Sequence, residues 1–291
     1  MELDASDFGV GDAIIVRCRP GQDLMSIPAE EFQSLVRSSG AILFKDFDAD
    51  ALSMMAFAER FSIRFNRDRL RVPIESTGGH VQLVTEGMGY IEPHAEQANS
   101  PFRPDAIWFC CGIPAETAGE TLFWDGVELW RRLSPEAKLL FGSKRLRYFQ
   151  KYRPDQWRLF LGDSATIVEV QQTLAGREGV SAFVNPDESI YLEYLCSAVI
   201  RTRYGAREAF ANGLLTERKN TLGGLMSFED GTLVHDGVIA EVEQTINEIV
   251  GVIDWQQGDL LFLDNTRYMH GRNAFTDKGR RIFSSMSFLN F

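Results

Sequence analysis

The histidines are the residues of this chain whose type and spacing could do chemistry. Only four occur, and His94 stands two positions before Glu96 in a Pro-His-Ala-Glu segment. In an extended backbone, residues i and i+2 project to the same face, so these two side chains can reach one point in space. His270, in a Tyr-Met-His-Gly-Arg segment, is the candidate for a third ligand. Two histidines and one carboxylate on one face of a metal, with the other face open, are typical of non-haem Fe(II) oxygenases.

The elements that must carry these residues are short strands with helices between them. A helix is expected to begin at Pro28, which suits the first helical position, and to end before Gly40. The apolar run that follows Gly40 indicates a buried strand. Strands in both halves of the chain, with helices outside them, predict a mainly β fold with flanking helices, of the β-sandwich or jelly-roll type. The expected strands are 41–44, 105–113, 120–125, 252–255, 260–265 and 281–288, and the expected helices are 28–39, 51–61, 127–133, one from 135, and one containing Ile239, Val242, Ile246 and Ile249.

Longer motifs around the candidate ligands resemble the TauD/TfdA-like family of Fe(II)/2-oxoglutarate-dependent oxygenases, including its clavaminate-synthase-like members. Residues 94–125 contain H-A-E, R-P-D-A-I-W-F-C-C and P-A-E-T-A-G-E-T-L-F-W-D. Residues 255–281 contain W-x-x-G-D-L-L-F-L-D-N, M-H-G-R and G-R-R. The segment 40–47, G-A-I-L-F-K-D-F, is similar to the family's first strand. These segments occur in the family's order, and that combination is far more specific than any one motif.

The resemblance implies a double-stranded β-helix (jelly-roll) core that binds Fe(II) and uses 2-oxoglutarate and O2. It implies that His94, Glu96 and His270 are the iron ligands. The family's 2-oxoglutarate anchor is an arginine some ten to fourteen residues after the distal histidine, and Arg281 fits that spacing. Thr121, in the G-E-T motif, is implied as support for the same carboxylate.

Elementary chemistry agrees with an arginine in that role, because its planar and permanently charged guanidinium binds a carboxylate with two hydrogen bonds. If 281–288 is a strand, Arg281, Phe283, Ser285 and Ser287 share one face, and Arg280 takes the other. We therefore expect Arg281 to point into the co-substrate pocket and Arg280 to point away from it.

The predicted activity is oxidation of a small metabolite, most simply hydroxylation of an unactivated C–H bond with release of succinate and CO2. The carboxylate ligand is Glu96 rather than the commoner Asp, as in some amino-acid hydroxylases of the clavaminate-synthase-like branch, so an amino acid or its derivative in specialised metabolism is the expected substrate. Desaturation and cyclisation stay open. Halogenation is disfavoured because Glu96 fills the position that a halide would take. Tyr90 and Gln97 are proposed for the substrate wall from their proximity to the ligands alone.

Two alternatives from other classes use the same His/Glu/His set. A Zn-dependent hydrolase would hold a water in the fourth position of the metal, although the helical H-E-x-x-H motif of many such enzymes does not accompany these residues. The second alternative is a non-enzymatic, cupin-like binding module. Metal-dependent release of succinate would separate these three possibilities.

The composition and net charge of the chain indicate which kinds of partner it binds. The chain has 291 residues, 44% of them hydrophobic, with 30 basic and 41 acidic residues and a formal net charge of −11. That charge argues against nucleic acid or an anionic membrane as a partner, so we expect a small-molecule substrate. The N-terminal segment is acidic and has no signal-peptide pattern, which predicts a cytoplasmic protein. The oligomeric state is not predicted.

The chain contains no linker-like segment and no repeat, so we expect one domain over 1–291, with a mixed insert at about 145–235. The four cysteines show no CxxC spacing and are too sparse for a disulfide scaffold. Cys110 and Cys111 are adjacent in an expected strand, so they should point to opposite faces as buried free thiols.

Overall fold

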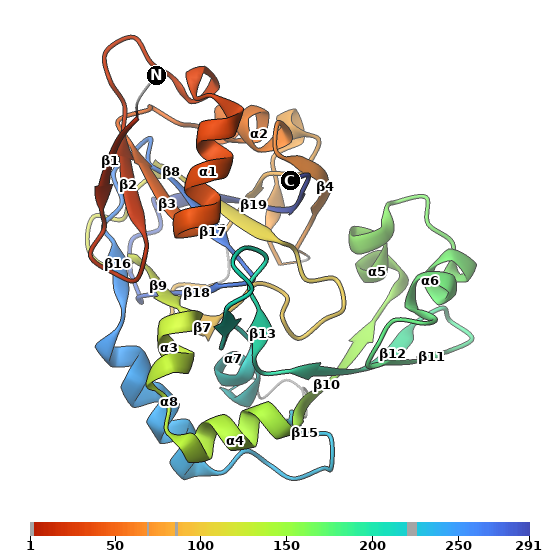
Figure 1. The fold of residues 1–291 in the computed structure, drawn as a ribbon. Helices are drawn as coiled ribbons and strands as arrows, with labels where there is room; N and C mark the ends of the chain where they lie inside the picture. The colour runs from red at the N-terminus through yellow and green to blue at the C-terminus, as the bar shows by residue number, and fades with distance from the viewer. Residues whose placement is uncertain (1–2, 69, 85–86, 220–225) are drawn as a thin grey trace.

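Two β-sheets that pack face to face form the centre of the protein (Figure 1). The structure is a computed structural model, and it describes residues 3–68, 70–84, 87–219 and 226–291. The larger sheet has nine strands in the order β1-β2-β3-β17-β8-β19-β6-β5, with β4 also paired to β19. The smaller sheet has the order β16-β9-β18-β7. All pairs are antiparallel except β2 with β3. The strands of the larger sheet are β1 Asp4–Asp7, β2 Ile14–Arg17, β3 Ala41–Lys45, β4 Ser62–Asn66, β5 Val72–Pro73, β6 Gln82–Leu83, β8 Ala106–Ile113, β17 Leu260–Asp264 and β19 Arg281–Leu289; those of the smaller are β7 Ile91–His94, β9 Thr121–Asp125, β16 Gly251–Ile253 and β18 Tyr268–Arg272.

The sequence of β8 is apolar throughout because both faces of this strand are buried. Phe109 and Cys111 lie in the core between the sheets, whereas Trp108 and Cys110 lie in the core under the helices. Side chains alternate across a strand, so a strand covered on both sides has no polar face. The predicted opposite orientation of Cys110 and Cys111 is confirmed, and both are buried free thiols.

Helices cover the outer faces of the sandwich. Phe32 of α1 and Phe57 of α2 pack on Trp108 of the larger sheet. α1 ends at Gly40, whose positive φ of 71° ends the helix as the sequence predicts, whereas Pro28 lies one residue before the helix. None of the described helices is long and apolar enough to cross a membrane. The helices outside the insert are α1 Ala29–Ser39, α2 Ala51–Glu59, α3 Gly126–Arg132, α4 Pro135–Ser143 and α8 Asp236–Glu248, with 3-10 turns at Leu24–Ser26 and Glu75–Thr77.

The insert, whose internal structure the sequence pattern left unassigned, builds a third sheet with the order β11-β12-β10-β15. One face of this sheet packs against α5 and α6 through Tyr152, Trp157, Val170 and Leu192. In Figure 1, α5, α6, β11 and β12 project to one side of the sandwich, and β10 leads back towards it. The elements of the insert are β10 Arg145–Tyr152, α5 Pro154–Leu161, α6 Ile167–Leu174, β11 Val180–Val184, β12 Ile190–Ser197, β13 Ile200–Arg201, β14 Glu208–Ala209, α7 Leu214–Lys219 and β15 Ser227–Phe228.

A buried ion pair joins the two sheets near the start of β18. The Arg267 side chain is 3% exposed and that of Asp125 is 4% exposed. Arg267 Nε donates to Asp125 Oδ1 at 3.0 Å, and its Nη1 donates to the carbonyl of Ser39 at 2.9 Å. Asp12 accepts from Nη2 at 2.7 Å. Because the guanidinium is bonded to three separate segments, it holds the turn before β18 in place.

We expect Arg267→Met to lower the free energy of unfolding by about 3–5 kcal/mol, since the buried Asp125 carboxylate would lose its cation. Urea unfolding followed by circular dichroism measures the change. The matched control is Arg131→Met, which breaks an exposed pair with Glu128 and should leave the unfolding midpoint nearly unchanged. Similar losses from both variants would contradict this account.

Candidate metal centre

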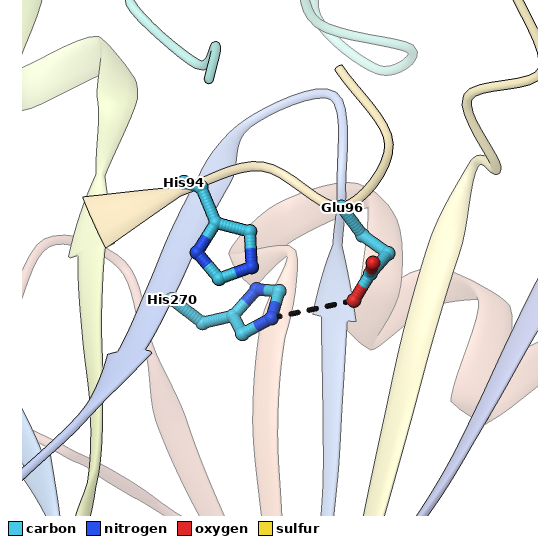
Figure 2. A group of neighbouring side chains, drawn as sticks. All are labelled: His94, Glu96 and His270. Atoms are coloured by element: carbon cyan, nitrogen blue, oxygen red, sulfur yellow. Dashed lines mark ion pairs between the residues drawn. The ribbon is translucent and has the colours of Figure 1, made fainter. Parts of the chain in front are cut away.

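Sheet register brings the two candidate histidines together. His94 ends β7 and His270 lies in β18, and the antiparallel pairing places them directly opposite each other. Cross-strand neighbours have Cβ atoms about 4.5–5.5 Å apart. The two imidazole rings accordingly lie with their centroids 4.4 Å apart (Figure 2). Residues far apart in the chain therefore meet through strand pairing.

Glu96 joins this pair because its backbone is held by a buried asparagine. The Asn265 side chain accepts from the Glu96 backbone N at 2.7 Å and donates to the Glu96 carbonyl at 3.0 Å. It also donates to the carbonyl of Pro104 at 2.9 Å. Asn265 lies between β17 and β18, so the turn that leads to His270 also fixes the segment that carries the carboxylate.

Arg71 balances the negative charge of Glu96, and the sequence did not indicate this role. Arg71 Nη2 lies 2.8 Å from Glu96 Oε2, and both side chains are 6% exposed. Its Nη1 donates to Ser284 Oγ at 3.2 Å. Burial alone would raise the pKa of Glu96, but the charge of Arg71 and the hydrogen bond from His270 hold that pKa well below its usual range. No motif marks Arg71, which reaches the site only through the folded chain.

The three side chains fit a divalent metal. Their ligand atoms all lie within 4.8 Å of one another, and His270 Nε2 is 3.5 Å from Glu96 Oε2. His94 Nδ1 bonds the carbonyl of Glu92 at 2.8 Å, which fixes that ring and leaves Nε2 for a metal. Within the described part of the chain, His270 Nδ1 is buried without a hydrogen-bond partner. Burial, and then the charge of His94, lower the pKa of His270 to about 4, so this ring stays neutral as ligation requires.

The three ligands line a cavity of about 350 Å³ between the two sheets. Thr121 on β9 lines it too; this residue is buried, and its hydroxyl accepts from Trp255 Nε1 at 2.9 Å. Gln97 also lines the cavity and is held by Asn66, which donates to its Oε1 at 3.0 Å. Tyr90 is 48% exposed and is not among the described residues of the cavity wall.

Arg280, which directly precedes β19, and Arg281, its first residue, are oriented opposite to the sequence-based expectation. Arg280 is 7% exposed, lines the cavity, and donates to the carbonyl of Gly119 at 3.1 Å. Arg281 is exposed and donates to backbone carbonyls of its own turn, including that of Lys278 at 2.9 Å. The predicted inward orientation of Arg281 is therefore wrong.

The orientation of the two arginines follows from which face of β19 is buried between the sheets. Ile282 and Met286 lie in the core between the sheets, so the even-numbered positions point inward. The polar residues that suggested a pocket lie elsewhere: Ser287 is buried on the other face, where its hydroxyl accepts from Trp108 Nε1 at 3.0 Å. The register of β19 also shifts between Arg281 and Ile282. The sequence alone does not distinguish a buried serine that accepts a hydrogen bond from a tryptophan from a serine that lines a pocket.

A jelly-roll sandwich with a two-histidine, one-carboxylate cluster on the wall of a cavity is typical of the class of non-haem metal oxygenases. The family model described as taurine catabolism dioxygenase TauD, TfdA family, matches residues 18–286. The chain belongs to this dioxygenase family, and the predicted resemblance, the jelly-roll fold and the enzyme class are confirmed. Iron and 2-oxoglutarate, the predicted cofactor and co-substrate, are those of the family.

Individual relatives are distant. Pentalenolactone F synthase of Streptomyces arenae is 29% identical over 171 residues, which span 58% of this chain and 52% of that protein. A clavaminate synthase-like protein of Arabidopsis thaliana is 23% identical over 87% of this chain and 83% of its own length. Among solved structures, PvcB of Pseudomonas aeruginosa superposes with a TM-score of 0.60 at 16% identity, covering 95% of this chain and 85% of that chain. PvcB is described as an Fe, alpha-ketoglutarate dependent oxygenase from an isonitrile synthetic pathway.

Replacing Arg71 tests the charge balance of the metal centre. Arg71→Met should lower the free energy of unfolding of the chelator-treated protein by about 3–5 kcal/mol, because the Glu96 charge would stay buried without a cation. The double variant Arg71→Met/Glu96→Gln removes both charges and should recover part of that loss. Urea unfolding in the presence of a chelator measures the wild type, the single variants Arg71→Met and Glu96→Gln, and the double variant. A double variant as unstable as the sum of its single changes would show that the two side chains do not interact.

Proposed function

We propose that this protein hydroxylates an unactivated C–H bond of a small metabolite, an amino acid or its derivative, with conversion of 2-oxoglutarate into succinate and CO2. In this proposal His94, Glu96 and His270 hold Fe(II). The observation that carries it is the cluster of these three side chains, half-buried His94 and buried Glu96 and His270, on the wall of a cavity that Arg280 and Thr121 also line. Two histidines and one carboxylate leave the remaining coordination positions open for a co-substrate and for dioxygen.

The chain's own residues supply binding, orientation and exclusion of water. Arg280 is proposed, in place of Arg281, to bind the distal carboxylate of 2-oxoglutarate, because its buried guanidinium is a charge-assisted donor inside the cavity. Thr121 is proposed to donate its hydroxyl hydrogen to the same carboxylate. Glu96 supplies the negative charge that balances the metal, and Arg71 holds its carboxylate. When bound, the iron supplies the activation of dioxygen that oxidises the substrate.

Several features support this activity over its alternatives. The cavity of about 350 Å³ lies at the small end of the usual range for ligand sites, which favours a small substrate. Glu96 lies within the ligand cluster, so the position that a halide would need is filled. Desaturation or cyclisation would use the same site. Membership of a dioxygenase family favours an oxygenase over a zinc hydrolase or a cupin-like binding module.

The proposal is tested by adding Fe(II) and 2-oxoglutarate to the protein without oxygen. We expect the weak visible charge-transfer band of a chelated keto acid, and succinate release once oxygen is admitted. Glu96→Ala removes one of three protein ligands and should abolish both signals while the circular dichroism spectrum is unchanged. Iron content is quantified for each sample. A protein that binds iron but shows no band with 2-oxoglutarate would refute the co-substrate assignment.

Arginine substitutions test the co-substrate subsite. Arg280→Ala should weaken 2-oxoglutarate binding roughly 30- to 1,000-fold, the loss expected for a charge-assisted pair in a shielded site. Arg281→Ala is the matched control, because Arg281 is the exposed arginine next to Arg280 in the chain, and it should change binding little. Titration of the visible band with 2-oxoglutarate gives both constants. A larger effect from Arg281 than from Arg280 would reverse this assignment.

A further inference from the structure

The cavity beside the metal centre has walls of different chemistry. Among the described residues of its wall, the arginines are Arg71, Arg272 and Arg280, and they belong to the part built around the jelly roll. The insert contributes a glutamate, Glu217, together with amide, hydroxyl and aromatic side chains. A ligand in this cavity therefore meets cationic groups on the jelly-roll side and an anionic group from the insert.

The arginines already have anionic or carbonyl partners. Arg71 pairs with Glu96. Arg272 donates to the carbonyls of Gly87 and Gly89 at 3.0 and 2.9 Å. Arg280 is the group proposed above for the distal carboxylate of 2-oxoglutarate. The cationic wall is thus suited to the dianionic co-substrate, and the primary substrate is left with the wall that the insert provides.

Glu217, on α7, is held in that wall by a chain of hydrogen bonds. Asn99 Nδ2 donates to Glu217 Oε1 at 2.5 Å, and the Asn99 backbone carbonyl accepts from Gln150 Nε2 at 2.9 Å. The Tyr152 hydroxyl donates to Gln150 Oε1. All four residues line the cavity, and Asn99 lies three positions after the metal ligand Glu96. The carboxylate is therefore positioned relative to the metal centre.

We propose that this wall binds a cationic nitrogen of the substrate, an ammonium or guanidinium group, with Glu217 as its counter-ion. This inference rests on the proposed function and specifies its substrate class. A half-buried carboxylate favours a cation through a charge-assisted hydrogen bond and disfavours an anion through like-charge repulsion.

Two further groups in the cavity favour the same class of ligand. The rings of Tyr152 and Phe160, which pack edge to face with centroids 5.7 Å apart, line the cavity from the insert. Aromatic faces attract ammonium and guanidinium groups. Asp68, from the segment between β4 and β5, also lines the cavity, so its described wall carries two carboxylates besides the candidate ligand Glu96. The anionic co-substrate explains neither the aromatic rings nor these two carboxylates.

The experiment uses three pairs of compounds that differ in whether they carry a cationic nitrogen. The pairs are L-leucine with Nα-acetyl-L-leucine, L-lysine with Nα,Nε-diacetyl-L-lysine, and L-arginine with Nα-acetyl-L-citrulline. Each is titrated into the protein with Fe(II) and 2-oxoglutarate under anaerobic conditions, and the shift of the visible band reports binding. Succinate release in air is the second readout. The band before any compound is added tests the proposed function separately.

We expect at least one compound with a cationic nitrogen to shift the band, and its acetylated counterpart to bind at least tenfold more weakly. Glu217→Gln, which keeps the shape and the acceptor for Asn99, should weaken that binding roughly 10- to 100-fold. The control Glu178→Gln changes an exposed glutamate of the same insert and should have no effect. A band that forms with 2-oxoglutarate but is shifted by no cationic compound, equal binding within a pair, or unchanged binding by Glu217→Gln would each overturn the proposal.

Discussion

The pairing of β7 with β18 is the constraint on which the site depends. It sets His94, at the end of β7, opposite His270. Asn265, in the turn before β18, then fixes the backbone of Glu96. Three ligands thus derive their positions from one strand and the turn that precedes it. A shift of one residue in this pairing would turn His270 towards the opposite face of the sheet and remove the metal centre.

Two buried ion pairs lie close to this strand, so charged groups are tolerated in this part of the interior. Arg267 and Asp125 compensate each other at one end of β18, and Arg71 compensates Glu96 at the ligand cluster. Isolated charges in such surroundings would be strongly destabilising, whereas paired charges with further hydrogen bonds are tolerated. The Arg71 pair also keeps the Glu96 carboxylate ionised, which is the form that a metal needs.

The wall of the cavity is divided between the sandwich and the insert. The sandwich side carries the three candidate ligands and the proposed co-substrate subsite. His94 and His270 lie on β7 and β18, whereas Glu96 and Arg280 lie just outside the strands that sheet hydrogen bonds hold in place. The insert adds Gln150, Tyr152 and Glu217 without contributing to the ligand cluster, and it has a small core of its own around α5 and α6.

The sequence by itself determined the fold class and the family, and it singled out His94, Glu96 and His270 as candidate ligands, because these depend on local signals: apolar strands such as β8, the Gly40 helix end, and motifs around His94 and His270. Only the tertiary structure decided which arginine enters the cavity. Both Arg280 and Arg281 satisfy the spacing, and the alternation of β19 could be read in either phase until its neighbours showed which face is inside. Arg71 and Glu217 carried no sequence signal, because their roles come from contacts between segments that are distant in the chain. Strand periodicity is a local property, whereas the direction of a side chain relative to a cavity depends on what packs against each face.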